Sequence, residues 1–125
     1  MAKVLISDKL SERAIDIFRE RGLEVDFKPG LSVEEQMAII GDYDGLAIRS
    51  ATKVTAEMLA AAPNLKLVGR AGIGVDNVDI PAATARGVVV MNTPHGNTIT
   101  TAEHAIAMLF ATARQIPAAD ASTQA

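Results

Sequence analysis

The sequence lacks cysteine and tryptophan, and aromatic residues make up only 3% of its 125 residues. Without cysteine there is no disulfide, no thiolate nucleophile and no cysteine-based metal site, and we predict that the chain holds no metal. The core must then consist of aliphatic side chains and methionine. With 12 Lys and Arg against 15 Asp and Glu, the formal net charge is −3. The absence of a basic cluster argues against a nucleic-acid partner.

Long hydrophobic runs are absent as well. A membrane-spanning helix needs about 20 apolar residues and a secretory signal needs an apolar core of roughly 7–15, and the sequence contains neither. These absences predict a cytoplasmic protein without a membrane partner. Hydrophobic residues make up 49% and charged residues 22% of the chain, which is typical of one globular domain.

Short apolar runs alternate with segments of helical periodicity along the chain. Helix start signals separate the runs: Ser32 and Glu35 have the spacing of a capping box, and Thr55 and Asp79 are N-cap candidates. Strands that alternate with helices favour an α/β fold with a parallel sheet covered on both faces. Right-handed crossovers favour a flavodoxin-like, doubly wound order, with the second strand at an edge. The five predicted strands are residues 4–6, 23–27, 45–48, 65–68 and 88–91.

The last predicted helix differs from the others because it is apolar on nearly all sides. It is expected to begin at a second capping-box pair, Thr100 and Glu103, and to run to about Arg114 or beyond. Such a helix is normally buried on several sides, and a single domain of this length covers only one of them. We therefore expect that the helix either pairs with a second copy, making a homo-oligomer, or is covered by the rest of a larger protein.

Polar residues and glycines follow several of the predicted strands, where ligands of open α/β sheets bind. Arginine offers a planar fork of donors suited to carboxylate or phosphate, and glycine lets backbone amides approach a ligand and form a nest. Asparagine beside a helix N-terminus adds another donor. Together these features predict a site for a small anion. Its candidate residues are Arg49, Ser50, Arg70, Gly72, Gly74 and Asn97.

Each candidate also has a simpler structural explanation. Arg49 and Arg70 are equally well explained as solvated strand ends, and Gly72 and Gly74 as parts of a tight turn. Asp8, which follows the first strand, is expected to be a turn residue. The site hypothesis is preferred because these features share one predicted edge of the sheet.

The glycine-rich segment at residues 69–74 differs from the dinucleotide-binding fingerprint. That motif is G-x-G-x-x-G at the start of a helix, with an acidic residue about 20 positions later. Here the spacing is G-x-x-G-x-G, and Val75-Asp76-Asn77 follows. No other segment supplies the fingerprint, so no nucleotide cofactor is expected to bind this chain tightly.

Several segments carry a family resemblance. Residues 47–55 (AIRSATKVT), 68–79 (VGRAGIGVDNVD), 90–97 (VMNTPHGN) and 113–117 (ARQIP) resemble the D-isomer-specific 2-hydroxyacid dehydrogenases. The resemblance covers essentially the whole chain. It is strongest to the members that oxidise D-3-phosphoglycerate to 3-phosphohydroxypyruvate with NAD, on the route to L-serine. Other members, which act on glyoxylate, hydroxypyruvate or lactate, stay open as alternatives.

The resemblance implies a domain organisation. Residues 1–97 are expected to be the first part of a flavodoxin-like substrate domain, and residues 98–125 a helix leading into a Rossmann cofactor domain. In the family that cofactor domain is inserted before a returning C-terminal segment of the substrate domain. Its glycine motif and the catalytic Arg, Glu and His lie beyond residue 125. NAD is therefore the expected cofactor of a longer parent enzyme, and this chain alone is expected to be inactive.

The resemblance also assigns roles to individual residues. Arg49, Ser50, Arg70 and Asn97 match residues that line the substrate pocket, and both arginines match residues that face anionic groups. Residues 72–74 match the loop that approaches the substrate carboxylate and the nicotinamide, mainly through backbone amides. Ile73 stands where some members have threonine, so only its backbone is expected to contact the cofactor.

A stand-alone flavodoxin-like binding or signalling module is an alternative from another class. A phospho-receiver domain would need an acceptor aspartate after the third strand and a lysine after the fifth. Arg49 and Ser50 follow the third strand, and Asn92 and Thr93 follow the fifth. The residues disfavour that interpretation.

Overall fold

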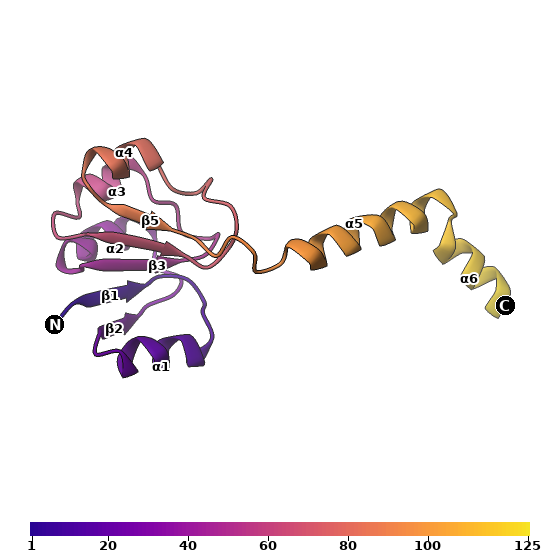
Figure 1. The fold of residues 1–125 in the computed structure, drawn as a ribbon, viewed down its shortest axis with the longest axis horizontal. Coiled ribbons are helices and arrows are strands. Elements are labelled where there is room, and N and C mark those ends of the chain that lie inside the picture. Colours follow the sequence, from indigo (N-terminus) through magenta and orange to yellow (C-terminus); the bar gives the residue numbers. More distant parts are fainter. The chain divides into compact units, whose positions relative to one another are not determined.

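The computed structural model describes residues 1 to 125 and divides into two units, Met1–Pro94 and His95–Ala125. The first unit is a sheet with its helices, and the second consists of two helices (Figure 1). The strands are β1 (Lys3–Ile6), β2 (Glu24–Phe27), β3 (Gly45–Ile48), β4 (Leu67–Arg70) and β5 (Val89–Met91). The helices are α1 (Glu12–Glu20), α2 (Val33–Ile39), α3 (Ala56–Ala60), α4 (Ile80–Ala85), α5 (Thr98–Ala113) and α6 (Ile116–Gln124), with a 3-10 turn, η1 (Ile40–Asp42), after α2.

The sheet is parallel throughout, and its strand order is β2-β1-β3-β4-β5. This is the predicted flavodoxin-like order, and β2 lies at the predicted edge. β4 begins two residues later than predicted. As a result, Arg70 is the last residue of the strand and pairs with Ile48 of β3.

The helix start signals of the first unit act as predicted. Glu35 N donates to the Ser32 hydroxyl at 3.2 Å, and Ser32 N donates to the Glu35 carboxylate at 2.8 Å, which completes the capping box. Thr55 and Asp79 each accept a hydrogen bond from the amide three residues later. These caps fix where α2, α3 and α4 begin, because each supplies a partner for a backbone donor that the helix cannot satisfy.

Two hydrophobic clusters lie on opposite faces of the sheet. The larger contains Leu46 and Val68 of the central strands, packed with Leu59 of α3. The smaller packs Ile6 of β1 against Ile15 of α1. Successive strand residues point to opposite faces, so β1 and β3 contribute to both clusters. Complete burial of one such side chain contributes about 1.5–3 kcal/mol, and the larger cluster therefore supplies most of the core stability.

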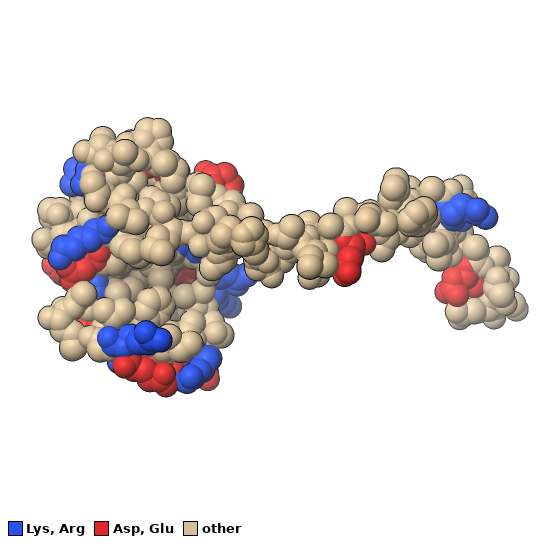
Figure 2. All heavy atoms as spheres, viewed as in Figure 1, with Lys and Arg blue, Asp and Glu red and all other residues tan.

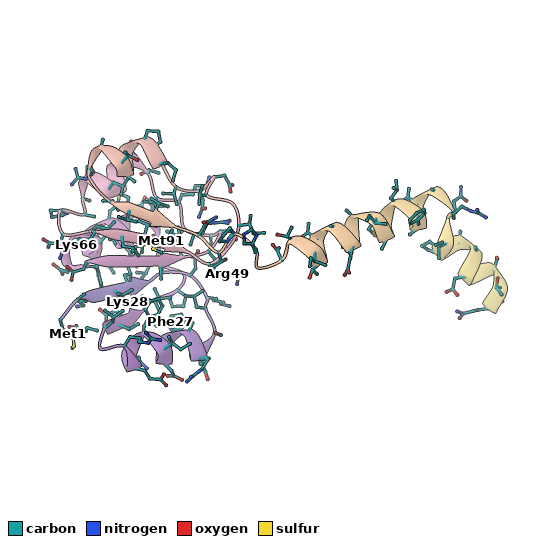
Figure 3. All side chains as sticks on the ribbon, viewed as in Figure 1. Met1, Phe27, Lys28, Arg49, Lys66 and Met91 are labelled. Carbon is teal, nitrogen blue, oxygen red and sulfur yellow. The ribbon has the colours of Figure 1, made fainter.

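One face of β4 and β5 is uncovered, so the expectation of a sheet covered on both faces is wrong for this half. Leu67 is 37% exposed, and Val89 and Met91 are each 55% exposed. On this face α1 packs only on the β1 side of the sheet. An apolar groove of about 640 Å³ results, and Met91, labelled in Figure 3, is among its lining residues.

The second unit departs from the sequence prediction at both of its helices. α5 begins at Thr98, two residues before the predicted capping box, and Asn97 occupies the N-cap without a side-chain hydrogen bond. The break that makes α6 a separate helix was not predicted. α6 begins after Gln115, whose left-handed backbone (φ 50°) ends α5, and Pro117 fits its first turn because an amide there needs no partner.

Neither helix of the second unit has a buried residue. Uncharged atoms predominate on its surface in Figure 2. Ile99, Leu109 and Phe110 are 74%, 65% and 58% exposed. None of the helices combines the length and the apolar character that crossing a membrane requires.

A buried tyrosine joins the amino ends of β1 and β3 to β2. Tyr43 is 2% exposed and donates a hydrogen bond to Asp26 at 2.7 Å. Lys3 lies 3.3 Å from the same carboxylate and 5.0 Å from the centre of the Tyr43 ring. The hydrogen bond from Tyr43, and then the contact with Lys3, lower the pKa of Asp26. Burial, and then the hydrogen bond to Asp26, raise the pKa of Tyr43.

We predict that Tyr43→Phe lowers the free energy of unfolding by about 1 kcal/mol at neutral pH, because it removes a hydrogen bond to a partly exposed carboxylate. Since the folded-state pKa of Asp26 is lowered, the ionised carboxylate stabilises the fold at pH values above the ordinary pKa of 3.8. This stabilisation is lost as the pH falls through the lowered pKa. Urea denaturation of both proteins should show the difference narrowing in that acidic range. A difference that stays constant down to complete protonation of Asp26 would contradict this.

Candidate functional site

The carboxyl ends of four parallel strands bring the candidate residues of the first unit to one edge of the sheet. Arg49 follows β3, and Arg70 ends the neighbouring strand β4. Figure 3 shows Arg49 at this edge and Met1 and Lys66 at the opposite edge. The structure therefore confirms the expectation that Arg49, Ser50 and Arg70 lie at the same edge.

The loop at residues 49–52 is bonded to Asp8, which follows β1. Asp8 Oδ2 accepts hydrogen bonds from Arg49 N at 2.6 Å and Thr52 N at 3.2 Å, and Oδ1 accepts one from the Thr52 hydroxyl at 2.7 Å. The Ser7 hydroxyl lies 2.9 Å from the Thr52 hydroxyl. Asp8 and Thr52 are 5% and 3% exposed. Asp8 is thus a buried, hydrogen-bonded carboxylate and more than the turn residue expected from the sequence.

The side chain of Asn77 binds the backbone carbonyl groups of the same loop. Its Nδ2 donates to Arg49 O and to Thr52 O, both at 2.7 Å. The backbone continues the link, because Val54 N donates to Asn77 O at 2.8 Å. Sequence reasoning missed Asn77 and Thr52. The only signal for Asn77 was its place directly after the glycine-rich segment, and nothing in the sequence marked Thr52 as buried.

The glycines at 72 and 74 make room for neighbouring side chains. Neither has a positive φ. A Cβ at Gly72 would lie 2.5 Å from Arg70 Nη1, and one at Gly74 would lie 2.8 Å from Asp76 Oδ1. Arg70 Nη1 donates to the carbonyl of Gly74. The turn therefore needs glycine so that the Arg70 guanidinium can lie against it.

Asn92 fixes the other side of this turn. Its Nδ2 donates to Ile73 O at 2.7 Å, and Thr93 N donates to Gly72 O at 3.0 Å. The amides of Ile73 and Gly74 form no hydrogen bond within the chain, and both residues are exposed. They are available as donors to a ligand, as the sequence predicts for this turn.

Arg49 and Arg70 contact different segments, although their strand ends are neighbours. Arg49 Nη1 donates to the carbonyl of Lys9 at 3.4 Å. The Arg49 residue lines a pocket of about 330 Å³ together with Lys9 and Ser50. Arg70 lies against the glycine turn. Neither arginine forms an ion pair with an acidic side chain of the chain. Two uncompensated guanidinium groups at one edge favour the binding of an anion.

Asn97 lies in the second unit, next to the start of α5. Its part in the site stays a prediction. His95 and His104 belong to the same unit and are exposed. The chemistry that the first unit offers is therefore recognition: two positive charges, a hydroxyl and free backbone amides at one edge can bind and orient an anionic molecule.

Comparisons with known proteins agree with the fold and the motifs. A family model described as the catalytic domain of D-isomer specific 2-hydroxyacid dehydrogenases matches residues 4–124. The D-3-phosphoglycerate dehydrogenase of Archaeoglobus fulgidus is 57% identical over 122 residues, which are 98% of this chain and 23% of that protein. The chain thus spans less than a quarter of that relative.

Two solved structures extend the similarity. A protein of Thermus thermophilus has a TM-score of 0.82 and 35% identity, covering 98% of this chain and 40% of that one. The NAD+-bound 3-phosphoglycerate dehydrogenase of Entamoeba histolytica has a TM-score of 0.76 and 32% identity, covering 88% of this chain and 38% of that one. The family model, the strand order and the sequence motifs agree, and the chain belongs to the D-isomer-specific 2-hydroxyacid dehydrogenases, within their catalytic domain.

Proposed function

We propose that this chain is the substrate-binding part of an NAD-dependent D-3-phosphoglycerate dehydrogenase, which oxidises D-3-phosphoglycerate to 3-phosphohydroxypyruvate for L-serine synthesis. The observation that carries the proposal is the 57% identity to the Archaeoglobus enzyme of that name over 98% of the chain. It favours this substrate over the glyoxylate, hydroxypyruvate and lactate alternatives. Membership of the family disfavours a stand-alone signalling module.

The proposed substrate site uses the carboxyl edge of the sheet. D-3-phosphoglycerate carries a carboxylate and a phosphate, and a guanidinium group suits either. Arg49 and Ser50 line the small pocket beside β1, while Arg70 lies at the glycine turn. The free amides of Ile73 and Gly74 add donors. We assign the two anionic ends of the substrate to these two arginines, and the contribution of Asn97 stays a prediction from the sequence.

Hydride transfer needs NAD held against the substrate, and the described residues do not fit a dinucleotide. The turn after β4 leads to a single bridge between Val54 and Val78 and only then to α4, whereas a dinucleotide-binding turn opens directly into a helix. We assign NAD binding and the catalytic acid–base residues to parts of the polypeptide outside these 125 residues. Under this proposal residues 1–97 are the substrate-binding part, residues 98–125 lead towards the cofactor domain, and the enzyme is cytoplasmic.

The first prediction concerns catalysis by the complete enzyme. It should reduce NAD with D-3-phosphoglycerate, and the 125-residue chain alone should not. Arg49→Gln and Arg70→Gln should each raise KM for D-3-phosphoglycerate at least about tenfold, because each removes a charged contact to the substrate. Steady-state assays of NAD reduction with D-3-phosphoglycerate, glycolate, D-glycerate and D-lactate as alternative substrates test this. Faster turnover of an unphosphorylated substrate would overturn the proposed specificity.

The second prediction concerns the glycine turn. Gly72→Ala should displace the Arg70 guanidinium and raise KM for D-3-phosphoglycerate towards the value of Arg70→Gln. It should change the free energy of unfolding by less than about 1 kcal/mol, because only the end of a flexible side chain must move. The double variant should be no worse than Arg70→Gln alone. Gly69→Ala is the matched control, since its Cβ would meet only Leu67, at 3.8 Å. Additive losses in the double variant would contradict the role given to Gly72.

The third prediction concerns α5. We propose that its exposed apolar side chains pair with a second copy of the chain and make it a homo-oligomer. Leu109→Glu combined with Phe110→Glu should shift the isolated chain towards the monomer in sedimentation velocity, while Ala121→Glu on the exposed surface of α6 should not. A monomeric unmodified chain in which α5 is ordered would refute this pairing.

A further inference from the structure

The backbone of the 49–52 loop has its donors and acceptors bound by two different side chains. The amides of Arg49 and Thr52 both donate to the carboxylate of Asp8. The carbonyl groups of the same two residues both accept from the side-chain amide of Asn77. The two residues between them, Ser50 and Ala51, are exposed. Asp8 and Asn77 therefore hold both ends of the loop and leave its centre open to a ligand.

Asp8 is an unusual choice for a purely structural contact. A carboxylate that is 5% exposed loses most of its hydration, which is costly unless hydrogen bonds replace it. Here two backbone amides and the Thr52 hydroxyl do so, and no cationic side chain pairs with it. The Arg49 guanidinium binds the carbonyl of Lys9 instead. Asp8 thus fixes the Arg49 backbone without neutralising the charge that the substrate needs.

Asn77 is equally specific in its orientation. Two carbonyl oxygens at 2.7 Å require the NH₂ end of the amide to face the loop. Asn77 also belongs to the segment that follows the glycine turn, so it joins the part of the site that contains Arg49 to the part that contains Arg70. A shift of either segment would change the distance between the two guanidinium groups.

We propose that Asp8 and Asn77 are positioning residues for substrate recognition: they set the distance and orientation of Arg49 and Ser50 relative to Arg70 and the glycine turn. This inference rests on the proposed function, because it takes the arginines to bind the two anionic ends of one substrate. Neither residue contacts the substrate itself. Their effect is expected on substrate affinity, because hydride transfer depends on groups elsewhere.

Two substitutions of Asp8 can separate the effect of its hydrogen-bond geometry from the effect of its negative charge. Asparagine at position 8 can keep its carbonyl at the place of Oδ2, facing the two amides. Its NH₂ group can donate to the Thr52 hydroxyl, which then donates to Ser7, 2.9 Å away. Alanine leaves the amides of Arg49 and Thr52 without an acceptor. Asp8→Asn should therefore preserve the loop and Asp8→Ala should not.

The test uses the complete enzyme and steady-state kinetics. Asp8→Ala should raise KM for D-3-phosphoglycerate at least about tenfold, because misplacing a binding group by about 1 Å can have an effect of tenfold or more. The value of kcat and the KM for NAD should change less than about threefold. Asp8→Asn should stay within about threefold of the unmodified enzyme. Asp16→Ala, an exposed position on α1, is the matched control.

Asn77→Asp provides a second, nearly isosteric variant. It places carboxylate oxygens opposite two carbonyl oxygens and should raise the same KM. Asn64→Asp is its control, because Asn64 also donates to a carbonyl, that of Gly41 at 2.7 Å, but precedes β4 at the opposite edge of the sheet. Hydrogen exchange of the Arg49 and Thr52 amides should be faster in Asp8→Ala and Asn77→Asp than in the unmodified enzyme, Asp8→Asn and Asn64→Asp.

These measurements separate the two proposals. An unmodified enzyme without activity on D-3-phosphoglycerate overturns the proposed function. Faster hydrogen exchange of the Arg49 and Thr52 amides in Asp8→Ala and Asn77→Asp would then still show that Asp8 and Asn77 fix the loop. An active enzyme in which Asp8→Ala and Asn77→Asp keep the KM of their controls overturns the inference. So does an Asp8→Asn variant as impaired as Asp8→Ala. Should Asp8→Ala fail to fold, the KM values of Asp8→Asn and Asn77→Asp still decide whether the two residues position the site.

Discussion

The parallel pairing of β3 with β4 places Ile48 opposite Arg70, and the candidate site of the first unit depends on that register. In a parallel sheet all strands end at the same edge, so segments that are distant in the sequence become neighbours without further design. Asp8 after β1 can therefore reach the loop after β3. In the same way Asn92 after β5 can reach the turn after β4. A slip of one residue between β3 and β4 would shift Arg70 relative to Arg49 and reverse which side chains face the core.

The two faces of the sheet are unequally covered by helices. α2, α3 and α4 cover the face that contains most of the buried side chains. The opposite face is covered by α1 on the β1 side only, so that Leu67, Val89 and Met91 stay exposed. The second unit has no buried residue of its own. Both features fit a chain that spans 23% of its Archaeoglobus relative.

Periodicity and capping signals were sufficient to predict the strands and the starts of α2, α3 and α4, because those signals are local. The order of the strands followed from the right-handed crossover rule. The local signals failed for α5, where Thr100 and Glu103 imitate a capping box inside a helix that has already begun at Thr98. They also missed the break before α6, because α6 has no buried residue and therefore no amphipathic pattern that would mark it as a separate helix. Arg49, Ser50 and Arg70 could be found from their places after apolar runs. Thr52 and Asn77 could not, since their burial and partners depend on contacts between segments 25 residues apart.

The central claim is that this edge of the sheet recognises one molecule with two anionic ends. The most direct measurement is a crystal structure of the complete protein with D-3-phosphoglycerate and NAD. We expect Arg49 and Arg70 to bind opposite ends of the substrate, with the amides of Ile73 and Gly74 donating to it and Asp8 still bonded to the Arg49 amide. A substrate bound away from the carboxyl edge of the sheet, or held by neither arginine, would contradict the account.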